Sequence, residues 1–269
     1  MVEETQKNQQ EHQDEWHYQW DKYKTQAHFL FFDWIQPRTL QDFDGKMVLD
    51  AGCGAGHHVQ LVASAATHVT GVDLNASDVA RTELSAFDNV TTLEGDIARF
   101  QPEEQLDIVY CVGVIHHTDD PDFTFDNLKK MVKPGGLLII WCYSKEGNEL
   151  VWKVVEPLRR RFLSRASRKM TVNISWLLTA LMYPAVYTLY LLPLKKLPFY
   201  EYFQNFRKLS FYRNFLNVFD KLNAPQTDFI SRERIESWFS DKDFTDISIT
   251  PYCGVSWRGS ARLRSGSAK

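Results

Sequence analysis

The sequence predicts an α/β fold built on a parallel sheet with helices crossing between its strands. Three observations support this prediction. From Lys46 onward, short apolar runs of strand length alternate with amphipathic stretches of helix length, which is the pattern of a parallel sheet with crossover helices. One of these runs ends in three glycines spaced two apart, as in turns that lead from a strand into a helix. At 269 residues and 44% hydrophobic, the chain can bury a full core.

We expect four parts along the chain. Residues 1–45 form a helical N-terminal arm, which starts polar and becomes aromatic. Residues 46–145 contain the alternating runs and form the core. Residues 146–226 break the alternation and form a basic and apolar helical insertion. In residues 227–269, "SRERIESWFSDKDF" predicts a helix with Ser231 as its N-cap, and "TDISITPY" and "SWRGSARLR" predict two strands that complete the sheet.

The stretch "VLDAGCGAG", residues 48–56, predicts a nucleotide site, because glycines let the backbone approach a ligand that side chains would exclude. A dinucleotide-binding turn is usually followed by an acid about 20 residues on, which contacts the ribose hydroxyls. Asp73 fits that place for either kind of ligand. Asp50 discriminates between them, because a carboxylate before the glycines would crowd a pyrophosphate but suits a ligand with an ammonium and a sulfonium. The site therefore favours S-adenosylmethionine over a nicotinamide cofactor.

Five motifs together resemble a known family. "VLDAGCGAG", "VTGVDL", "LEGDI", "LDIVYCVGVIHH" and "VKPGGLL" have the order and spacing of the class I S-adenosylmethionine-dependent methyltransferases, and they look most like the small-molecule and lipid-modifying branch of type 11 and 12. The match covers residues 46–145, and "GVSWRGSARL" is compatible with the closing hairpin of the family. The resemblance implies a Rossmann-like seven-stranded methyltransferase sheet with helices on both faces, the last strand antiparallel, and a helical insertion after the fifth strand.

The resemblance also implies which residues hold S-adenosyl-L-methionine. Asp50 and the backbone of Gly52, Gly54 and Gly56 would hold the methionine part of the cofactor. Asp73 would accept hydrogen bonds from both ribose hydroxyls, as a carboxylate can accept two at once.

The adenine and the methyl group have their own implied contacts. Asp96 would accept from the adenine amino group, and Leu74 and Ile97 would lie on the two faces of the ring. Cys111 and Val112, just past the fourth strand, would face the amino acid end and the methyl group. The alternatives stay open: the acids after the second and third strands could be ordinary loop acids, and Cys111 could be a small core residue.

Two histidines are the candidate catalytic residues. "VIHHTDDP" places His116 and His117 at the carboxyl end of the fourth strand, beside the expected methyl group, where an imidazole suits the work of a general base. His116 is the first choice. The alternative is that both histidines only shape the pocket or cap the following helix. An aromatic arm around Tyr18, Trp20 and Tyr23 either closes over the cofactor or covers the sheet.

The activity that these residues predict is methyl transfer to oxygen, nitrogen or carbon of a small-molecule or lipid-like acceptor. The alternative outside enzymes is an inactive methyltransferase-like protein that binds cofactor or a partner. The alternative among enzymes is an NAD-dependent oxidoreductase, which Asp50 and "KPGG" disfavour. Four cysteines lie far apart without paired spacing, so we expect neither a metal site nor disulfides.

The insertion has three open interpretations. Its centre, Thr171 to Leu194, has 24 residues without a charge, and basic residues flank both sides. This length could cross a bilayer, but Pro184 and Pro193 interrupt the run, and two basic flanks disfavour a single span. The segment is expected to form an acceptor lid, a homodimer contact, or an interfacial element on an anionic membrane surface. Nucleic acid is not an expected partner, because the centre is so apolar.

The polar, acidic N-terminus lacks the basic start and apolar run of a signal peptide. We therefore expect a cytoplasmic protein, peripheral at the membrane if the insertion contacts lipid.

Overall fold

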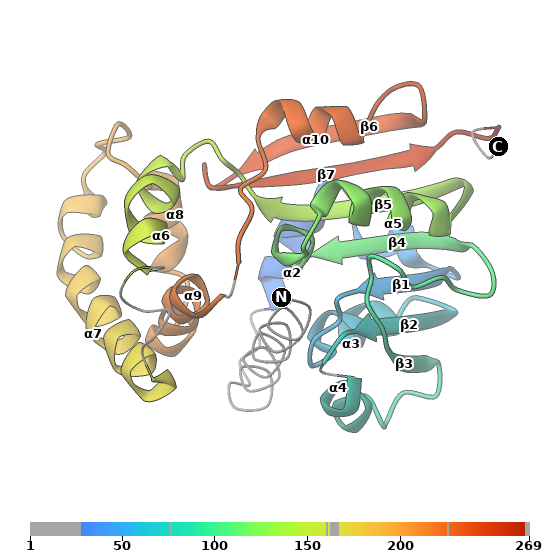
Figure 1. The fold of residues 1–269 in the computed structure, drawn as a ribbon, viewed down its shortest axis with the longest axis horizontal. Helices are drawn as coiled ribbons and strands as arrows, with labels where there is room; N and C mark the ends of the chain where they lie inside the picture. Colours follow the sequence, from blue (N-terminus) through green and yellow to red (C-terminus); the bar gives the residue numbers. More distant parts are fainter. Residues whose placement is uncertain (1–27, 76, 160, 162–166, 225, 267–269) are drawn as a thin grey trace.

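A computed structural model describes residues 28–75, 77–159, 161, 167–224 and 226–266. The described residues form one seven-stranded sheet with the strand order β3-β2-β1-β4-β5-β7-β6 (Figure 1). The pairs among β1 to β5 are parallel, and β7 is antiparallel to β5 and β6. This confirms the predicted Rossmann-like sheet. The strands are β1 Met47–Ala51, β2 His68–Asp73, β3 Val90–Glu94, β4 Leu106–Val112, β5 Val132–Tyr143, β6 Phe244–Tyr252 and β7 Ser256–Leu263.

Helices cover both faces of the sheet, because parallel strands need crossover connections. One face packs against α2 His28–Ile35, α3 His57–Ala63 and α4 Ser77–Glu83. The other face packs against α5 Pro121–Met131 and α10 Arg232–Trp238. Alternate residues of a strand point to opposite faces, so Tyr110 of β4 belongs to the first core and Cys111 to the second. The predicted helix cap is confirmed, since the Ser231 side chain accepts from the Arg234 amide.

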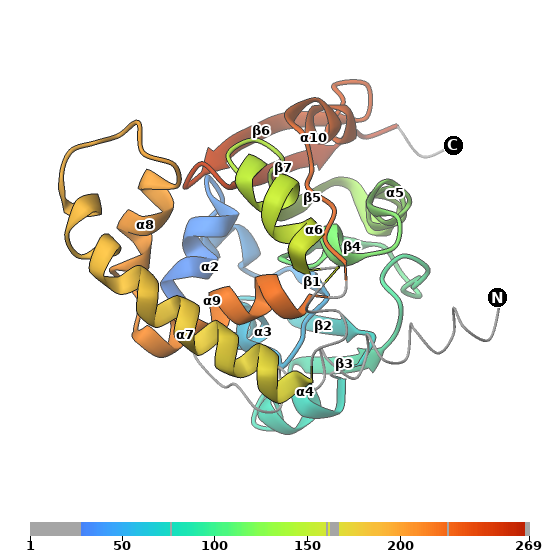
Figure 2. The ribbon, with the colours of Figure 1, turned by 60° about the vertical axis from the view of Figure 1, so that its left-hand side comes forward.

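Of the described helices between β5 and β6, four that precede α10 form a separate group beyond the carboxyl ends of β4 and β5 (Figure 1). Turning the molecule shows α7 running across the outside of this group (Figure 2), where it packs on α8 and α9. Pro184 lies inside α7, which ends two residues beyond it, so the uncharged run 171–194 does not form one continuous helix. The helices are α6 Glu156–Leu158, α7 Arg168–Val186, α8 Tyr200–Phe206 and α9 Phe211–Asn223.

Tyr252 of β6 joins this helical group to the core. Its hydroxyl donates to Asp33 of α2 at 3.2 Å and accepts from the side-chain amide of Asn205 of α8 at 3.0 Å. Within the described part of the chain, no helix combines the length and the apolar character that a bilayer crossing needs.

Candidate cofactor and acceptor site

The three glycines after β1 form a tight turn that only glycine can adopt easily. Gly52, Gly54 and Gly56 have φ values of 95°, 51° and 83°, in the left-handed region that other residues avoid. A Cβ on Gly52 would lie 2.4 Å from a methyl of Val114, and a Cβ on Gly56 would lie 2.6 Å from Leu84. The turn therefore packs directly on the loop after β4.

Asp73 lies at the end of β2, beside this turn. Its Oδ2 accepts from the backbone N–H of Gly54 at 2.9 Å, and its Oδ1 accepts from the N–H of Asn75 at 3.0 Å. The two bonds hold the carboxylate at the carboxyl edge of the sheet, where ligands of open α/β sheets bind. The ribose contact implied for Asp73 stays a prediction, and it agrees with this position.

Asp50 of β1 is a buried carboxyl group with an unused oxygen. The residue is 1% exposed, and neither its Oδ2 nor the Tyr110 hydroxyl has a hydrogen-bond partner among the described residues. Burial raises the pKa of Asp50 to about 8, nearby Tyr110 opposes the rise, and Asp73 adds to it. A buried polar group without a partner is costly, so this carboxyl group fits the cationic amino group of S-adenosylmethionine.

The adenine side is more exposed. The Asp96 side chain is 44% exposed, and its Oδ1 accepts from the N–H of Ala98 at 2.9 Å. Leu74 is 41% exposed, whereas Ile97 is 6% exposed and belongs to the core. The N–H of Gly95 donates to the Asp73 carbonyl, so the ends of β2 and β3 are adjacent. The adenine contacts of Asp96, Leu74 and Ile97 stay predictions.

Cys111 and Val112 lie inside β4 rather than past it, which corrects the predicted strand end. The strand continues because Val112 still pairs with Trp141 of β5. The Cys111 side chain is fully buried in the core beside α5, and the Val112 side chain belongs to the opposite core. The two side chains therefore point to opposite faces of the sheet, and the cofactor contacts implied for Cys111 and Val112 stay predictions.

His116 and His117 lie in the short turn Ile115–His117 after β4. His116 is fully buried, and neither ring nitrogen has a hydrogen-bond partner in the described part of the chain. Its ring centroid lies 4.3 Å from that of Tyr143. Burial, followed by His117 and Lys221, lowers the pKa of His116 well below its usual value, so the ring is neutral.

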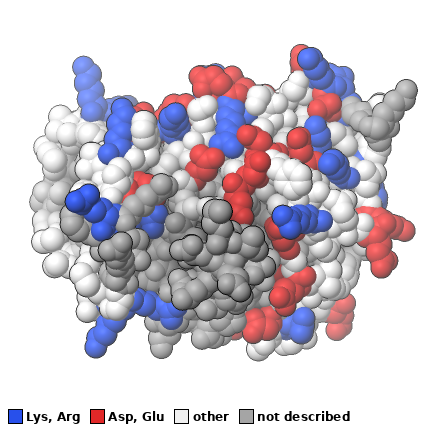
Figure 3. All heavy atoms as spheres, in the orientation of Figure 1, with Lys and Arg blue, Asp and Glu red and all other residues white. Residues whose placement is uncertain are grey.

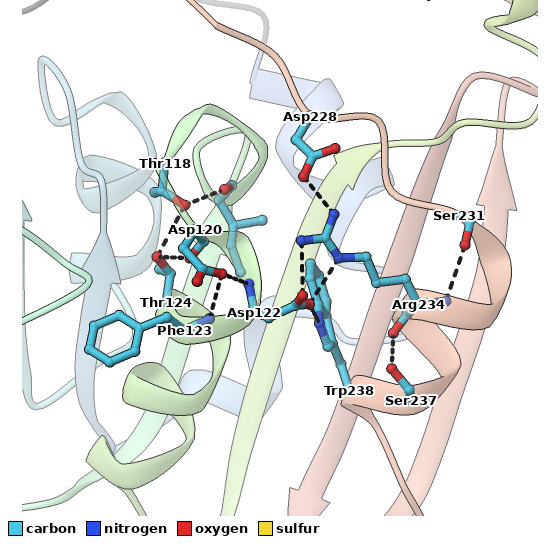
Figure 4. Close-up of polar contacts among 11 residues, drawn as sticks. Thr118, Asp120, Asp122, Phe123, Thr124, Asp228, Ser231, Arg234, Ser237 and Trp238 are labelled. Carbon is cyan, nitrogen blue, oxygen red and sulfur yellow. Dashed lines mark hydrogen bonds and ion pairs between the residues drawn. The ribbon is translucent and has the colours of Figure 1, made fainter.

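His117 contacts the segment after α9. Its Nδ1 lies 2.8 Å from the carbonyl oxygen of Gln226, and Nδ1 must therefore carry the proton, because a carbonyl only accepts. Burial lowers the pKa of His117 as well. The interpretation that these histidines cap the next helix was wrong, because the Asp120 side chain accepts from the first amides of α5 (Figure 4).

A cluster of charged side chains, Asp122, Asp228 and Arg234, lies beside the turn that contains the two histidines (Figure 4). Arg234 of α10 bonds both carboxylate oxygens of Asp122 and also bonds Asp228. The N–H of Asp228 in turn donates to the His116 carbonyl at 2.8 Å. These contacts join α5, α10 and the segment after the insertion around the histidine turn.

A cavity of about 270 Å³ lies between the carboxyl end of β5 and the insertion. This volume is close to the roughly 300 Å³ at which small-molecule pockets begin. Its walls are mainly aromatic and aliphatic, and they come from α2, β5, α7, α8, α9 and the β6–β7 turn. They include Trp34, Trp141, Met182, Phe203 and Lys221.

Trp141 connects this cavity to the glycine turn. Its ring lines the cavity and stacks on Trp34 with centroids 4.6 Å apart. A Cβ on Gly113 would lie 3.7 Å from the same ring, and the next residue, Val114, packs on Gly52. In the described part of the chain, the loop after β4 and the indole ring of Trp141 therefore lie between the predicted cofactor turn and the cavity.

Sequence reasoning missed the polar side chains of the cavity. Tyr143, Asn217 and Lys221 line it, but none of them belongs to a recognisable motif. The strong amphipathic pattern of "FYRNFLNVFDKLN" predicts a helix but does not say what its polar face meets. Tyr18, Trp20 and Tyr23 of the predicted aromatic arm lie outside the described residues.

Comparisons with known proteins agree with this geometry. Residues 49–140 match the family model described as "Methyltransferase domain". The chain is similar to ubiquinone biosynthesis O-methyltransferase of Pseudomonas syringae pv. tomato, with 30% identity over 132 residues, 47% of this chain and 56% of that protein. It is also similar to the Aeromonas salmonicida protein of the same name, with 30% identity over 128 residues, 46% of this chain and 53% of that protein. The chain thus spans about half the length of the curated relatives it matches.

Solved structures share the fold over most of both chains. One is the DhpI-SAH complex, with a TM-score of 0.54, 13% identity, and coverage of 94% of this chain and 95% of that one. Another is magnesium protoporphyrin IX methyltransferase from Synechocystis PCC 6803 with bound SAH, with a TM-score of 0.50, 16% identity and 94% of each chain covered.

The sheet order and the glycine turn define a Rossmann-like methyltransferase core. The chain carries a class I S-adenosylmethionine-dependent methyltransferase domain, and S-adenosylmethionine is the cofactor of that class.

Proposed function

We propose that this protein transfers a methyl group from S-adenosylmethionine to an oxygen atom of a small, largely apolar acceptor in the cavity beside β5. The observation that carries the proposal is the position of Trp141. This residue lines the cavity and contacts the loop that packs on the glycine turn. Transfer to oxygen is favoured over nitrogen and carbon by the relatives named as O-methyltransferases.

The chain's own residues hold the cofactor and exclude water. The glycine turn and Asp50 would hold the methionine part, and Asp73 and Asp96 the nucleoside. When bound, S-adenosylmethionine supplies a methyl group already activated on a sulfonium. The protein then needs mainly to place the acceptor oxygen in line with that methyl, and such positioning is worth on the order of 7–11 kcal/mol in favourable cases. The aromatic walls of the cavity suit this task, because they restrict a flat acceptor and keep water out.

The base role of His116 stays a prediction. A base must come within hydrogen-bond reach of the proton it takes, and His116 is buried behind the ring of Tyr143, which lines the cavity. The geometry favours the alternative, in which His116 and His117 position Tyr143 and the wall of the pocket. A neutral imidazole without hydrogen-bond partners can fill this apolar space without carrying a charge.

Label transfer tests the proposed activity. The protein is incubated with cofactor carrying a ¹³C-methyl group and with lipid, quinone and glycan extracts, and the products are examined by NMR. We expect new methoxy signals in an apolar fraction. Signals from N-methyl or C-methyl groups alone would contradict transfer to oxygen. Binding of S-adenosylhomocysteine without transfer to any fraction would support the alternative of an inactive cofactor-binding protein.

A second proposal concerns the place where the protein acts, and it depends on α7. The buried residues of this helix include Thr171, Ser175 and Thr179. Their hydroxyl groups are satisfied within the helix, since Ser175 donates to the Thr171 carbonyl at 2.8 Å and Thr179 to the Ser175 carbonyl at 2.6 Å. By contrast, Leu177 and Leu181 are 60% and 64% exposed. In α7 the hydroxyl side chains are buried and the leucines are exposed, whereas a surface helix normally buries its apolar side chains.

The surroundings of this apolar face are basic. Leucines remain exposed in the segment after α7, at positions 189, 191, 192 and 194. No acid occurs from residue 157 to residue 200, whereas Arg168, Lys169, Lys195 and Lys196 flank the segment. Figure 3 shows mainly basic and uncharged atoms over the insertion and most acidic side chains over the sheet. We propose that this face lies on an anionic membrane surface, since exposed apolar side chains beside basic ones suit that surface.

A further inference from the structure

The cavity contains one charged side chain among the described residues that line it, Lys221 of α9. Its Nζ lies 5.0 Å from the ring centroid of Tyr143 and 5.3 Å from that of Tyr202. Its hydrogen bond to the carbonyl of Asn217 is long, at 3.5 Å. An ammonium has three donors, and a cation removed from water is costly unless it is paired. Apart from the bond to Asn217 and the Tyr202 side chain, the described residues give the Lys221 ammonium no further hydrogen-bond partner, and it faces an apolar cavity.

Among the described residues, two buried cations of α9, Lys221 and Arg213, lie near the Asp220 carboxylate. Asp220 accepts from the Tyr143 hydroxyl at 3.0 Å. Arg213 of the same helix has a buried Nε without a hydrogen-bond partner in the described part of the chain. Lys221 and Arg213 thus share the carboxylate of Asp220. Glu156 of α6 pairs with Arg159, the residue that follows this helix.

The remaining titratable neighbours do not supply the missing negative charge. Burial raises the pKa of Tyr143 above its usual value, so this phenol is neutral near pH 7. Burial lowers the pKa of both His116 and His117, so the two imidazoles are neutral. Burial also opposes the charge of Lys221, but the Asp220 carboxylate and a hydrogen bond with the Tyr202 side chain favour it, and the pKa of Lys221 lies above its usual value. The ammonium stays charged, and in the described part of the chain it shares its one carboxylate, Asp220, with Arg213.

We propose that Lys221 binds the ionised oxygen of the acceptor, and that the acceptor is a phenol or another acidic aromatic hydroxyl compound with an apolar substituent. This rests on the proposed methyl transfer. The flat walls formed by Trp141 and Tyr143 suit an aromatic ring, and the rest of the cavity suits the apolar substituent. Opposite charge within about 4–6 Å favours the ionised form of an acid.

The proposed methyl transfer balances in atoms and in charge without a general base from the protein. The acceptor hydroxyl loses its proton to solvent water as it binds beside Lys221. An electron pair of the resulting oxyanion forms the new carbon–oxygen bond, while the carbon–sulfur bond breaks and its electron pair remains on sulfur. The products are a neutral methyl ether and a neutral thioether. The ether has no charge for Lys221 to hold, so its release is favoured.

An absorbing probe tests the anion site independently of turnover. In 2-nitro-4-octylphenol, the phenolate has its own visible absorption band, so the pKa of the bound probe can be titrated on the full chain with saturating S-adenosylhomocysteine. Lys221→Met keeps the length of the side chain and removes its charge, and Lys208→Met is a matched control at an exposed lysine outside the cavity lining. We expect the parent and Lys208→Met to lower the probe pKa by at least one unit, and Lys221→Met to abolish that shift.

Three further measurements assign every outcome. The methyl ether of the probe should bind the parent and Lys221→Met equally, which shows that the cavity of the variant is intact. A full pKa shift in Lys221→Met overturns the proposal, and so does the absence of a shift in the parent. Lys221-dependent binding of 4-octylbenzoate without a phenol shift overturns the phenol class. Calorimetry with S-adenosylhomocysteine measures cofactor binding separately. A failure of the methyl-transfer proposal can therefore be distinguished from a failure of the anion site at Lys221.

Discussion

The backbone N–H of Gly54 donates a 2.9 Å hydrogen bond to Oδ2 of Asp73. This bond joins the turn after β1 to the end of β2, so two of the predicted cofactor contacts belong to one structural unit. Asp73 therefore has two tasks: it stabilises the left-handed turn and presents a carboxylate beside it. A change at Asp73 should affect cofactor binding more than it affects the rest of the fold.

Asp73→Ala should weaken binding of S-adenosylhomocysteine by at least tenfold, because each hydrogen bond to a charged group contributes about 1.5–3 kcal/mol. Asp73→Asn is the matched control, since its amide oxygen can still accept from Gly54, and it should lose less affinity. Isothermal calorimetry measures both, and thermal melting checks the fold. A folded alanine variant with parental affinity would remove Asp73 from the cofactor site.

Affinity for S-adenosylhomocysteine should increase as the pH rises from 6.5 to 9. The pKa of Asp50 is raised to about 8, so below that pH the carboxyl group is protonated and pairs poorly with the ligand's ammonium. Asp50→Asn should bind weakly with a flatter pH dependence. Calorimetry across this range compares the two proteins, and parallel pH profiles would show that another group is responsible.

The same pKa predicts a stability effect of opposite sign. Between the ordinary value of 3.8 and about 8, the folded protein holds a proton on Asp50 that the unfolded chain loses. The free energy of unfolding of the ligand-free protein therefore falls as pH rises through this window. Asp50→Asn should remove that part of the slope and be the more stable protein at pH 8. Urea unfolding at pH 6 and pH 8 measures the difference, and an unstabilised Asp50→Asn at pH 8 would contradict the buried position.

Gly52→Ala should lower the free energy of unfolding by about 2–5 kcal/mol, because alanine is strained in the left-handed backbone of Gly52 and its Cβ would collide with Val114. Gly254→Ala is the control, because Gly254 has a φ of 65° and nothing within 4 Å of its added Cβ. It should lose only about 1–2 kcal/mol. Combining Gly52→Ala with Val114→Ala should recover the part due to the collision. Equal losses in the two single variants would contradict the close packing.

His116→Phe keeps a ring in the core and removes the imidazole. If the ring only positions Tyr143, turnover should stay within about tenfold of the parent and the pH profile should keep its shape. General base catalysis is typically worth 10²–10⁴-fold, so a loss of about 100-fold or more with unchanged S-adenosylhomocysteine affinity would establish His116 as the base.

The protein should float with anionic vesicles at low salt and be released at high salt, since each basic residue near such a surface contributes about 1 kcal/mol. Replacing Leu177 and Leu181 with serine should abolish flotation. Phe123→Ser is the control, because Phe123 is 53% exposed on α5, a helix that packs on the sheet and not on α7. Flotation of the double variant, or no flotation of the parent, would contradict membrane contact. A parent that dimerises in solution through Leu177 and Leu181 would indicate a homodimer interface instead.

The sequence by itself determined the features that depend on local chemistry. The alternation of apolar runs predicted the parallel strands, because their length and spacing leave few other ways to bury them. The glycines at 52, 54 and 56 predicted the turn, since their backbone angles exclude other residues. Ser231 predicted the start of α10, because an N-cap bonds an amide only three residues away.

Only the tertiary structure decided which way side chains point and what they meet. Cys111 faces the core, because register in the sheet assigns each β4 residue to one face. His116 is buried by Tyr143 and His117, and α7 turns its hydroxyl groups inward and its leucines outward. Lys221 faces the cavity because α9 packs against α7 and brings this side chain to Tyr143 of β5 and Tyr202 of α8. These outcomes come from contacts between segments far apart in the chain, and no periodicity or spacing within one segment contains them.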